Sequence, residues 1–307
     1  MKQSIPVANA AKKQEQMYAK IAIIVPTLGF ITAIWWSANY GFSWVDLALL
    51  VGMFSLTNLG ITAGFHRFFA HHSYKTTKPV QVLLAIAGSM ALQGPVLFWS
   101  AIHRKHHQYS DSFEDPHSPY KHGEGIEGRL KGWWHSHVGW MFDRDSENWI
   151  RYVPDLLKDK LIFKMSYWYF YWVLLGLLIP AILGGLLTTT WQGMISGLLW
   201  GGFARIFLLH HTTWSVNSIG HIYGFQQYET KDESKNNLIL GLLGFGGGWH
   251  NNHHAFPLSA RHGLKWWQLD IAYLFISLLQ KIGLVWDVNL PTQKMLETKV
   301  KKGASQL

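Results

Sequence analysis

The sequence predicts an all-α integral membrane protein in which four transmembrane helices carry a histidine-rich helical cap on the cytosolic side. Three observations predict this fold class. Four apolar runs each approach the roughly 20 residues that a helix needs to cross the hydrocarbon core. The large basic segments all fall on one side of these runs. Clusters of histidines adjoin the ends of the runs on that same side.

The composition agrees with a membrane protein and restricts the chemistry. Hydrophobic residues make up 49% of the 307 residues and charged residues 15%, although a large soluble core would also allow these fractions. The chain has no cysteine, which excludes disulfides, iron–sulfur clusters and thiolate zinc sites. Its formal net charge is +9, carried by segments between apolar runs. We therefore expect a membrane surface or an acidic protein partner, and no nucleic acid.

The first two apolar runs form a transmembrane hairpin over residues 21–65. The preceding residues, 1–20, are polar and basic, and they lack the cleavage site of a signal peptide, so we expect a cytosolic N-terminal segment. Residues 21–40 make the first span, and Trp44 begins the second after a short link. The second span therefore returns to the starting side.

The apolar run over residues 80–102 is long enough to span, but Gln93, Gly94 and Pro95 interrupt it. If this run crossed the bilayer, the histidines on its two sides would lie on opposite faces of the membrane and could not share one site. We therefore predict a broken helix that lies at the interface or dips into protein, where irregular backbone is tolerated. It belongs to a cytosolic or interfacial segment over residues 66–165.

A second transmembrane hairpin is predicted over residues 166–212, with spans at about 166–187 and 191–212. The loops on the far side hold essentially no Lys or Arg, so the positive-inside rule makes the basic side, with both termini, cytoplasmic. Residues 213–307 form a cytosolic C-terminal segment. Within it, about 266–285 is apolar but interrupted by polar residues, which predicts an interfacial or docking helix.

Two histidine clusters share the spacing HxxHH, at residues 103–107 and 250–254. Residues three and four apart are neighbours on a helix, so each cluster places three imidazoles on one face. A third cluster, His66 with His71, follows the second span, and His221 closes the fourth. Neutral imidazole is the commonest metal ligand and suits iron, zinc and copper. The predicted topology brings these histidines to the cytoplasmic rim as one metal site.

So many imidazoles exceed what one ion takes, which predicts a dinuclear site. In an ideal α-helix, positions five apart point about 140° apart, so His66 and His71 could each serve a different ion. Zinc sites use three or four ligands, and the paired Glu-x-x-His helices of soluble di-iron bundles are absent. Two irons handling O2 are therefore favoured. The remaining histidines are predicted to be structural: His72, His117, His122, His135, His137, His210, His211 and His262. His211 is the strongest exception to this prediction, because it lies near Asn217 and His221.

At these residues the chain resembles the membrane fatty acyl desaturases of the stearoyl-CoA desaturase type. The likeness covers roughly residues 55–290 and rests on the strings HRFFAH, HRKHHQYSDSFEDPHSP, HVGW, TTWSVNSIGH and HNNHHAFP. It implies four transmembrane helices, a cytosolic centre of two iron ions, and O2-dependent formation of a cis double bond, most often at Δ9. By matched motif it implies that the metal ligands are His66, His71, His103, His106, His107, His221, His250, His253 and His254, with Asn217 holding one metal through water.

The same resemblance implies a bent acyl tunnel. Its residues would be Gln93, Trp99 and Thr213 at the bend, with Trp140 of the HVGW string. Helix geometry places Phe54 about 18 Å deeper than His66 if the second span is a continuous α-helix, so Met53 and Phe54 are candidates for the tunnel floor. The resemblance implies a small residue at this position where longer chains are preferred, so a Phe here implies acyl chains of about 16 carbons or fewer. Alternatively, Phe54 faces lipid or packs between helices.

Electrons must come from a separate protein, because the chain has neither cysteine nor the His-Pro-Gly-Gly haem motif. We expect a donor of the ferredoxin or cytochrome b5 type. Six basic residues could steer an acidic donor, or they could simply form a solvated positive-inside face. These residues are Arg104, Lys105, Arg129, Lys131, Arg261 and Lys265.

Two aspects of the chemistry stay open in the sequence. The resemblance implies that animal acyl-CoA enzymes of this type contact CoA through an Arg-Asp pair just before the second histidine box. This chain has Ala101 and Ile102 there, so this contact with CoA is not predicted. An acyl group on CoA, on acyl carrier protein or in a glycerolipid therefore remains possible. Related enzymes also make terminal alkenes or triple bonds, or hydroxylate alkyl chains. A metal transporter is disfavoured, because ion pathways need polar groups within the spans, and these spans have almost none.

Overall fold

The structure, a computed structural model, describes residues 5–143 and 149–301 and is built almost entirely of helices. Within these residues, four helical stretches are long and apolar enough to cross a membrane, as the sequence predicts. They are Lys12–Tyr40, Trp44–Ala70, Tyr169–Thr188 and Trp191–Ile222. The second and fourth extend beyond the predicted spans toward the histidine clusters, which makes their ends part of the candidate site.

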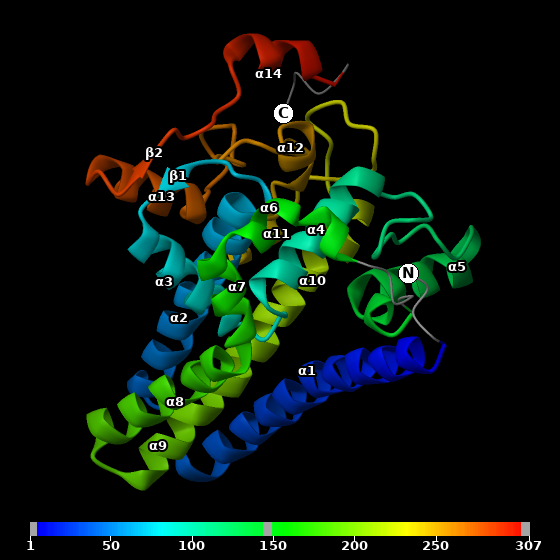
Figure 1. The fold of residues 1–307 in the computed structure, drawn as a ribbon. Coiled ribbons are helices and arrows are strands. Elements are labelled where there is room, and N and C mark those ends of the chain that lie inside the picture. Colours follow the sequence, from blue (N-terminus) through cyan, green and yellow to red (C-terminus); the bar gives the residue numbers. More distant parts are fainter. Residues whose placement is uncertain (1–4, 144–148, 302–307) are drawn as a thin grey trace.

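The first pair of long helices meets in a tight turn (Figure 1). Helix α1 (Ile5–Tyr40) ends at Gly41, whose φ of +87° is a conformation that glycine adopts at helix C-termini. Helix α2 (Trp44–Leu59) begins with a capping box, in which the Ser43 hydroxyl accepts from the backbone N–H of Asp46 and the Asp46 carboxylate accepts from that of Ser43. The helix continues without a break into the π-helix η1 (Gly60–Ala70).

The run at residues 80–102 is broken, as predicted. Helix α3 (Lys78–Ser89) and helix α4 (Val96–Tyr109) are separated by six residues, 90–95. Pro95 directly precedes α4 in an extended conformation, with a ψ of 155°. Neither helix is long enough to count among the four candidate spans.

The second pair of long helices consists of α8 (Tyr169–Thr188) and a composite helix of α9 (Trp191–Gly197), the π-helix η4 (Leu198–Ala204) and α10 (Arg205–Ile222). Glycines allow these two helices to approach closely. A Cβ atom on Gly184 would lie 2.2 Å from the Gly193 carbonyl oxygen, and one on Gly197 would lie 2.2 Å from the Pro180 carbonyl oxygen. Small residues at such contacts are typical of helices that pack within membranes.

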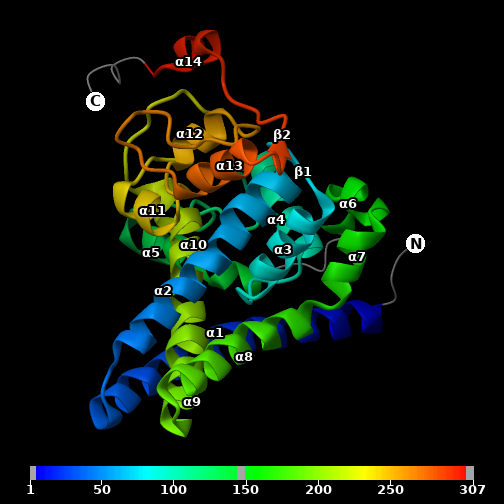
Figure 2. The same cartoon turned by 90° about the vertical axis from the view of Figure 1, so that its left-hand side faces the viewer.

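The remaining elements cover one end of the long helices, where Figures 1 and 2 show α12, α13, α14 and both strands together. These elements are β1 (Lys75–Thr76), α5 (Gly125–His137), η2 (Gly139–Met141), η3 (Trp149–Tyr152), α6 (Pro154–Lys158), α7 (Lys160–Tyr167), α11 (Leu238–Leu243), α12 (His250–Ala255), α13 (Ile271–Lys281), β2 (Val285–Trp286) and α14 (Gln293–Lys299). Strands β1 and β2 pair antiparallel, with Lys75 opposite Trp286.

The helix predicted at about residues 266–285 is shorter than expected. It forms only as α13, because Asp270 is its N-cap and accepts a hydrogen bond from the backbone N–H of Tyr273. The same carboxylate accepts two hydrogen bonds from Arg67 of η1, at 2.9 and 3.1 Å, and both residues are buried. This ion pair, made by one guanidinium nitrogen, ties the start of α13 to the end of the second long helix.

Candidate metal centre

The π-helix η1 aligns two histidines that an α-helix would separate. The backbone N–H of His71 donates to the carbonyl of His66 at 3.1 Å, the five-residue spacing of a π-helix. This bond stacks the two residues on one side of the helix, and their ring centroids lie 4.9 Å apart. The expectation that His66 and His71 point about 140° apart, toward different ions, is therefore wrong, because it assumed α-helical geometry.

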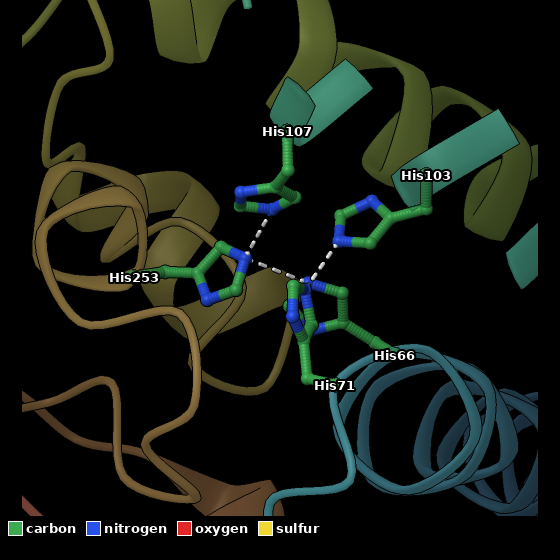
Figure 3. A group of neighbouring side chains, drawn as sticks. All are labelled: His66, His71, His103, His107 and His253. Carbon is green, nitrogen blue, oxygen red and sulfur yellow. Dashed lines mark hydrogen bonds between the residues drawn. The ribbon is translucent and has the colours of Figure 1, made fainter. Parts of the chain in front are cut away.

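Five histidines from three helical segments converge in what we call the first histidine group: His66, His71, His103, His107 and His253. Figure 3 shows their rings pointing toward one another. The Nε2 atoms of His66 and His253 lie 3.0 Å apart, and His253 is 2.8 Å from His107. His71 and His103 form a further contact of 2.8 Å between their Nε2 atoms. One nitrogen from each of the five lies within 4.8 Å of the others.

Four more histidines form the second histidine group: His106, His221, His250 and His254. The Nε2 atoms of His221 and His250 lie 2.9 Å apart, and those of His106 and His254 lie 3.3 Å apart. These rings come from α4, α10 and α12. One nitrogen from each again lies within 4.8 Å of the others.

Each HxxHH box is divided between the two groups. In α4, His103 and His107 join the first group and His106 the second. Consecutive residues on an α-helix are about 100° apart, so the residues three and four positions after the first histidine lie on either side of it. One short helix can therefore serve two adjacent centres. In α12 the division is reversed, with His253 in the first group and the other two histidines in the second.

Three carboxylates stand behind rings of the second group. The Nδ1 of His106 donates to Asp115 at 3.0 Å, that of His221 to Asp111 at 3.0 Å, and that of His254 to Asp232 at 2.8 Å. Histidines that bind metals commonly donate their other ring N–H to a carboxylate, which fixes the tautomer and the ring orientation. The sequence alone predicts no role for these aspartates. Their only local signal is that Asp111 and Asp115 follow the HxxHH box within a few residues.

Burial lowers the pKa of rings in both groups, including His250 and His254 of the second, and His106 departs from this pattern. Burial, reinforced by neighbouring imidazoles, lowers the pKa of His71 to about 3 and holds the pKa of His103 and His107 well below the usual value. Burial also opposes the charged form of His106, but the carboxylates of Asp115, Asp111 and Asp232 together outweigh it and raise the pKa of that ring. Although Asp115 is buried, His106 keeps its pKa below the usual range. The first group is therefore neutral, which is the form of imidazole that binds metals.

Two histidines predicted to be structural lie against these groups. The ring of His117 is 4.4 Å from that of His106, and His106, Asp115 and His117 form a third set of possible ligand atoms within 4.8 Å. The ring of His262 is 4.5 Å from that of His253, and its Nε2 accepts a hydrogen bond from Arg67 at 3.3 Å.

His211, named above as the strongest exception, lies in neither histidine group. Its Nδ1 is 3.0 Å from the Nε2 of His137, and the Nδ1 of His137 is in turn 3.0 Å from the Ser218 hydroxyl. Asn217 is half-buried on α10, one helical turn before His221 and on the same face. Its binding of a metal through water stays a prediction.

The three residues predicted at the tunnel bend are joined by hydrogen bonds. The side-chain amide of Gln93 donates to the Thr213 hydroxyl at 3.0 Å, and the indole N–H of Trp99 donates to the Gln93 oxygen at 3.3 Å. The Trp99 ring stacks on His103, with centroids 5.1 Å apart. The bend residues therefore adjoin the first histidine group. Trp140 instead packs 5.6 Å from His117, beside the second group.

The predicted tunnel floor lies on α2. Met53 is buried, and Phe54 is half-buried with its ring edge-on to Phe245 at 6.1 Å. The estimate of 18 Å between Phe54 and His66 assumed α-helix throughout. Because η1 is a π-helix, with more residues in each turn, the true axial separation is smaller.

Arg104, one of the six predicted donor-steering residues, has a structural role. Its guanidinium donates to the backbone carbonyls of Phe69 and Ala70, each at 2.9 Å, and pairs with Asp155. It thereby holds the end of η1 in place. Lys131 pairs with Glu127 one helical turn away, while Arg129 and Lys265 are exposed.

The donor set fits two metal ions. Nine imidazoles present their Nε2 atoms to one another in two clusters, and the Nδ1 atoms of three of them donate to carboxylates. All nine histidines implied by the family resemblance are in these clusters. Purely nitrogen coordination suits iron, zinc or copper, and calcium and magnesium prefer oxygen.

Comparison with known proteins gives a consistent picture. Residues 41–283 match the family described as fatty acid desaturase. The chain is 49% identical over 281 residues to a hex-5-enoyl-[acyl-carrier protein] acetylenase of Moorena producens, covering 90% of this chain and 87% of the relative. It is 40% identical over 257 residues to a chloroplastic palmitoyl-monogalactosyldiacylglycerol delta-7 desaturase of Arabidopsis thaliana, covering 83% of this chain and 65% of the relative. An sn-1 stearoyl-lipid 9-desaturase of Anabaena variabilis is 38% identical over 257 residues, covering 82% and 87%.

Proposed function

The chain belongs to the fatty acid desaturase family and is an acyl desaturase, and we propose that it introduces a cis double bond into a saturated acyl chain by means of two iron ions. The observation that carries this proposal is the pair of adjacent histidine groups, each with its Nε2 atoms converging. The first group would hold one iron and the second group the other, with Asn217 holding the second through water.

The bound irons would activate O2 to remove two hydrogens from adjacent methylenes, a reaction that no side chain performs unaided. The side chains of the protein position the ligand rings and the acyl chain. Asp111, Asp115 and Asp232 keep three rings oriented with Nε2 inward. Gln93 and Trp99 support a bend in the acyl chain beside His103. The buried apolar surroundings would keep water away from the reacting methylenes.

The residues just before the second histidine box limit which acyl carrier the protein is expected to use. Ala101 is fully buried and Ile102 is 7% exposed, so this position offers no charged group to a CoA head. The relatives named above act on chains held by acyl carrier protein or in lipids. We therefore favour acyl carrier protein or a glycerolipid over CoA. The double-bond position proposed is Δ9.

A second candidate function is the formation of a triple bond or a terminal alkene on the same scaffold. It is favoured by the 49% identity to an acetylenase over 90% of this chain. An acetylenase starts from a chain that already holds a double bond and so differs from the first candidate in its substrate, whereas formation of a terminal alkene starts from a saturated chain and differs in the position of the new bond.

We further propose that the protein is a multi-pass membrane protein with the metal centre and both termini on the cytoplasmic side. The four candidate spans and the basic segments on one side support this orientation. Electrons would come from a ferredoxin or a cytochrome b5-type protein. A tag inserted at Ser112 should be accessible only from the cytoplasm, and labelling from outside would overturn the orientation.

The function is tested by supplying the purified, iron-loaded enzyme with O2, ferredoxin and one acyl chain in three forms: on acyl carrier protein, on CoA and in a glycerolipid. Saturated and monounsaturated chains are compared, and methyl esters of the products are examined by mass spectrometry. We expect a cis double bond in the saturated chain on acyl carrier protein or lipid. Products from unsaturated chains alone, or a terminal double bond in the saturated chain, would favour the second candidate, and an absence of product in all arms would refute both.

A further inference from the structure

The break between α3 and α4 has an unfavourable backbone conformation. Leu92 has a φ of +57°, in the left-handed region that residues with side chains rarely adopt. Gly94 follows with a φ of +96°, and a Cβ atom there would lie 2.7 Å from the Phe98 ring. Such conformations persist only where the surroundings hold them, and they gather at functional sites. The contacts that hold residues 90–95 are therefore informative.

Helix α10 holds this break at three positions. The guanidinium of Arg205 donates to the Met90 carbonyl at 2.7 Å, and the Nε2–H of His210 donates to the Ala91 carbonyl at 2.8 Å. Thr213, further along α10, accepts the hydrogen bond from the Gln93 side chain already described. Successive residues of α10 thus meet successive residues of the break, in one direction along both segments.

Arg205 and His210 are also unusual in their surroundings. They are 0% and 1% exposed, and both lie within the candidate span Trp191–Ile222. The other donors of Arg205 reach the carbonyls of Gly176 at 2.8 Å and Gly201 at 3.1 Å. Buried ionisable groups within membrane spans are costly and are retained for function. Arg67 is equally buried but pairs with a carboxylate, whereas the contacts of Arg205 are with backbone oxygens.

Further contacts hold residues 90–95 in place. A Cβ atom on Gly176 would lie 2.8 Å from the Met90 Cβ and 3.3 Å from an Arg205 nitrogen, so only glycine leaves room for Arg205 to bridge the two helices. The backbone N–H of Gly94 donates to the Tyr169 hydroxyl at 2.9 Å. Met90, Ala91, Gln93 and Gly94 are thus each held by a side chain of α8 or α10.

We propose that Arg205 and His210 are positioning residues that set which carbons of the acyl chain meet the first histidine group. The proposal rests on the proposed function, in which the chain bends at Gln93 and Trp99. A movement of residues 90–93 would be passed through the Gln93 side chain to the indole N–H of Trp99, whose ring stacks on His103. The bend would then move relative to the metal centre, and a neighbouring pair of methylenes would be presented.

The test compares His210→Leu, which removes the donor to Ala91, with His210→Gln, which keeps an N–H donor. His211→Leu is the matched control on the adjacent residue, which contacts His137 and not the break. Two quantities are measured in lipid nanodiscs: hydrogen–deuterium exchange of the amides at 90–95, and the ratio of double-bond positional isomers in the product. Arg205→Lys, which keeps the charge but loses the fork geometry, is measured alongside.

We expect faster exchange at 90–95 in His210→Leu and a second positional isomer in its product, with His210→Gln and His211→Leu close to wild type. Unchanged exchange would show that His210 does not hold the break, and faster exchange with an unchanged isomer ratio would show that the break does not set the position. Either result overturns the proposal. If His210→Leu fails to fold, His210→Asn, whose shorter amide withdraws the donor from Ala91, takes its place. A wild-type protein that makes no unsaturated product refutes the proposed function instead, while the exchange measurement still reports on the contact.

Discussion

The two histidine groups differ in what stands behind their rings. In the second group, His106, His221 and His254 each donate from Nδ1 to an aspartate. In the first group, no ring has a carboxylate partner within residues 5–143 and 149–301, and the buried Nδ1 of His253 has no hydrogen-bond partner there. The rings of the first group have aromatic neighbours instead: Trp99 stacks on His103, and His262 packs against His253.

This difference shows two ways of orienting an imidazole. A carboxylate behind a ring fixes its tautomer and strengthens it as a ligand, so the second group is oriented by charge. Packing and burial orient the first group, which has an apolar face on the side of Trp99, whereas His262, bound to Arg67, lies against His253. An apolar face is what a hydrocarbon chain requires, and the predicted bend residues adjoin this group. We infer that the first group faces the substrate and the second faces the polar loops that carry the aspartates.

The largest expected effect is the loss of one ring from either group. His106→Ala removes a member of the second group and His253→Ala a member of the first, and each should abolish turnover and lower the bound iron. Because zinc binds imidazole sites tightly, turnover is the primary readout and iron content the secondary one. His211→Ala, outside both groups, is the control and should keep its activity.

Full activity in either His106→Ala or His253→Ala would contradict the ligand assignment for that group. A loss of activity in only one of the two variants would therefore leave the ligand assignment standing for that group alone.

A smaller effect is expected from the carboxylates, and it should fall on the second group alone. Asp115→Asn keeps the size of the side chain but weakens the support of His106, and losses of such outer partners typically cost about 10- to 100-fold in metal affinity or activity. Titration of iron into metal-free protein should show one site weakened and the other unchanged. Asp143→Asn is the control, because the Asp143 side chain is 74% exposed and its contact with the His135 Nδ1 is long, at 3.9 Å.

If Asp115→Asn bound both irons as tightly as Asp143→Asn does, the carboxylates would not distinguish the two groups. If it weakened both sites equally, the groups would act as one coupled unit. The carboxylates would then not distinguish the second histidine group from the first.

Much of the fold could be predicted because its signals are local. Apolar runs of about the membrane thickness indicate helices wherever they occur, and Gln93, Gly94 and Pro95 mark the break between α3 and α4 within a few residues. The HxxHH spacings likewise place metal-binding side chains on short helices without knowledge of the rest of the chain.

The missed features depend on contacts between distant residues or on backbone geometry without a spacing signal. Asp111 meets His221 across 110 positions, and Asp232 meets His254 across 22. The π-helix at Gly60–Ala70 has no sequence period that separates it from an α-helix, and it alone explains the alignment of His66 with His71. The role of Arg205 has no sequence signal either, because one charge in an apolar run does not show which carbonyls it will contact.

The smallest expected effect lies on the substrate side of the first group and leaves the metal centre intact. Phe54 is half-buried on α2 and packs edge-on against Phe245. If it closes the tunnel, Phe54→Ala should lengthen the tunnel and move the preference toward longer acyl chains, with unchanged iron content. Competition between chains of two lengths in one reaction measures this shift. Leu56→Ala, an exposed position on the same helix at 44%, is the control for general loosening of α2. Identical chain-length profiles in wild type and Phe54→Ala would show that Phe54 only packs between helices, and the apolar face of the first group would then have its limit set elsewhere.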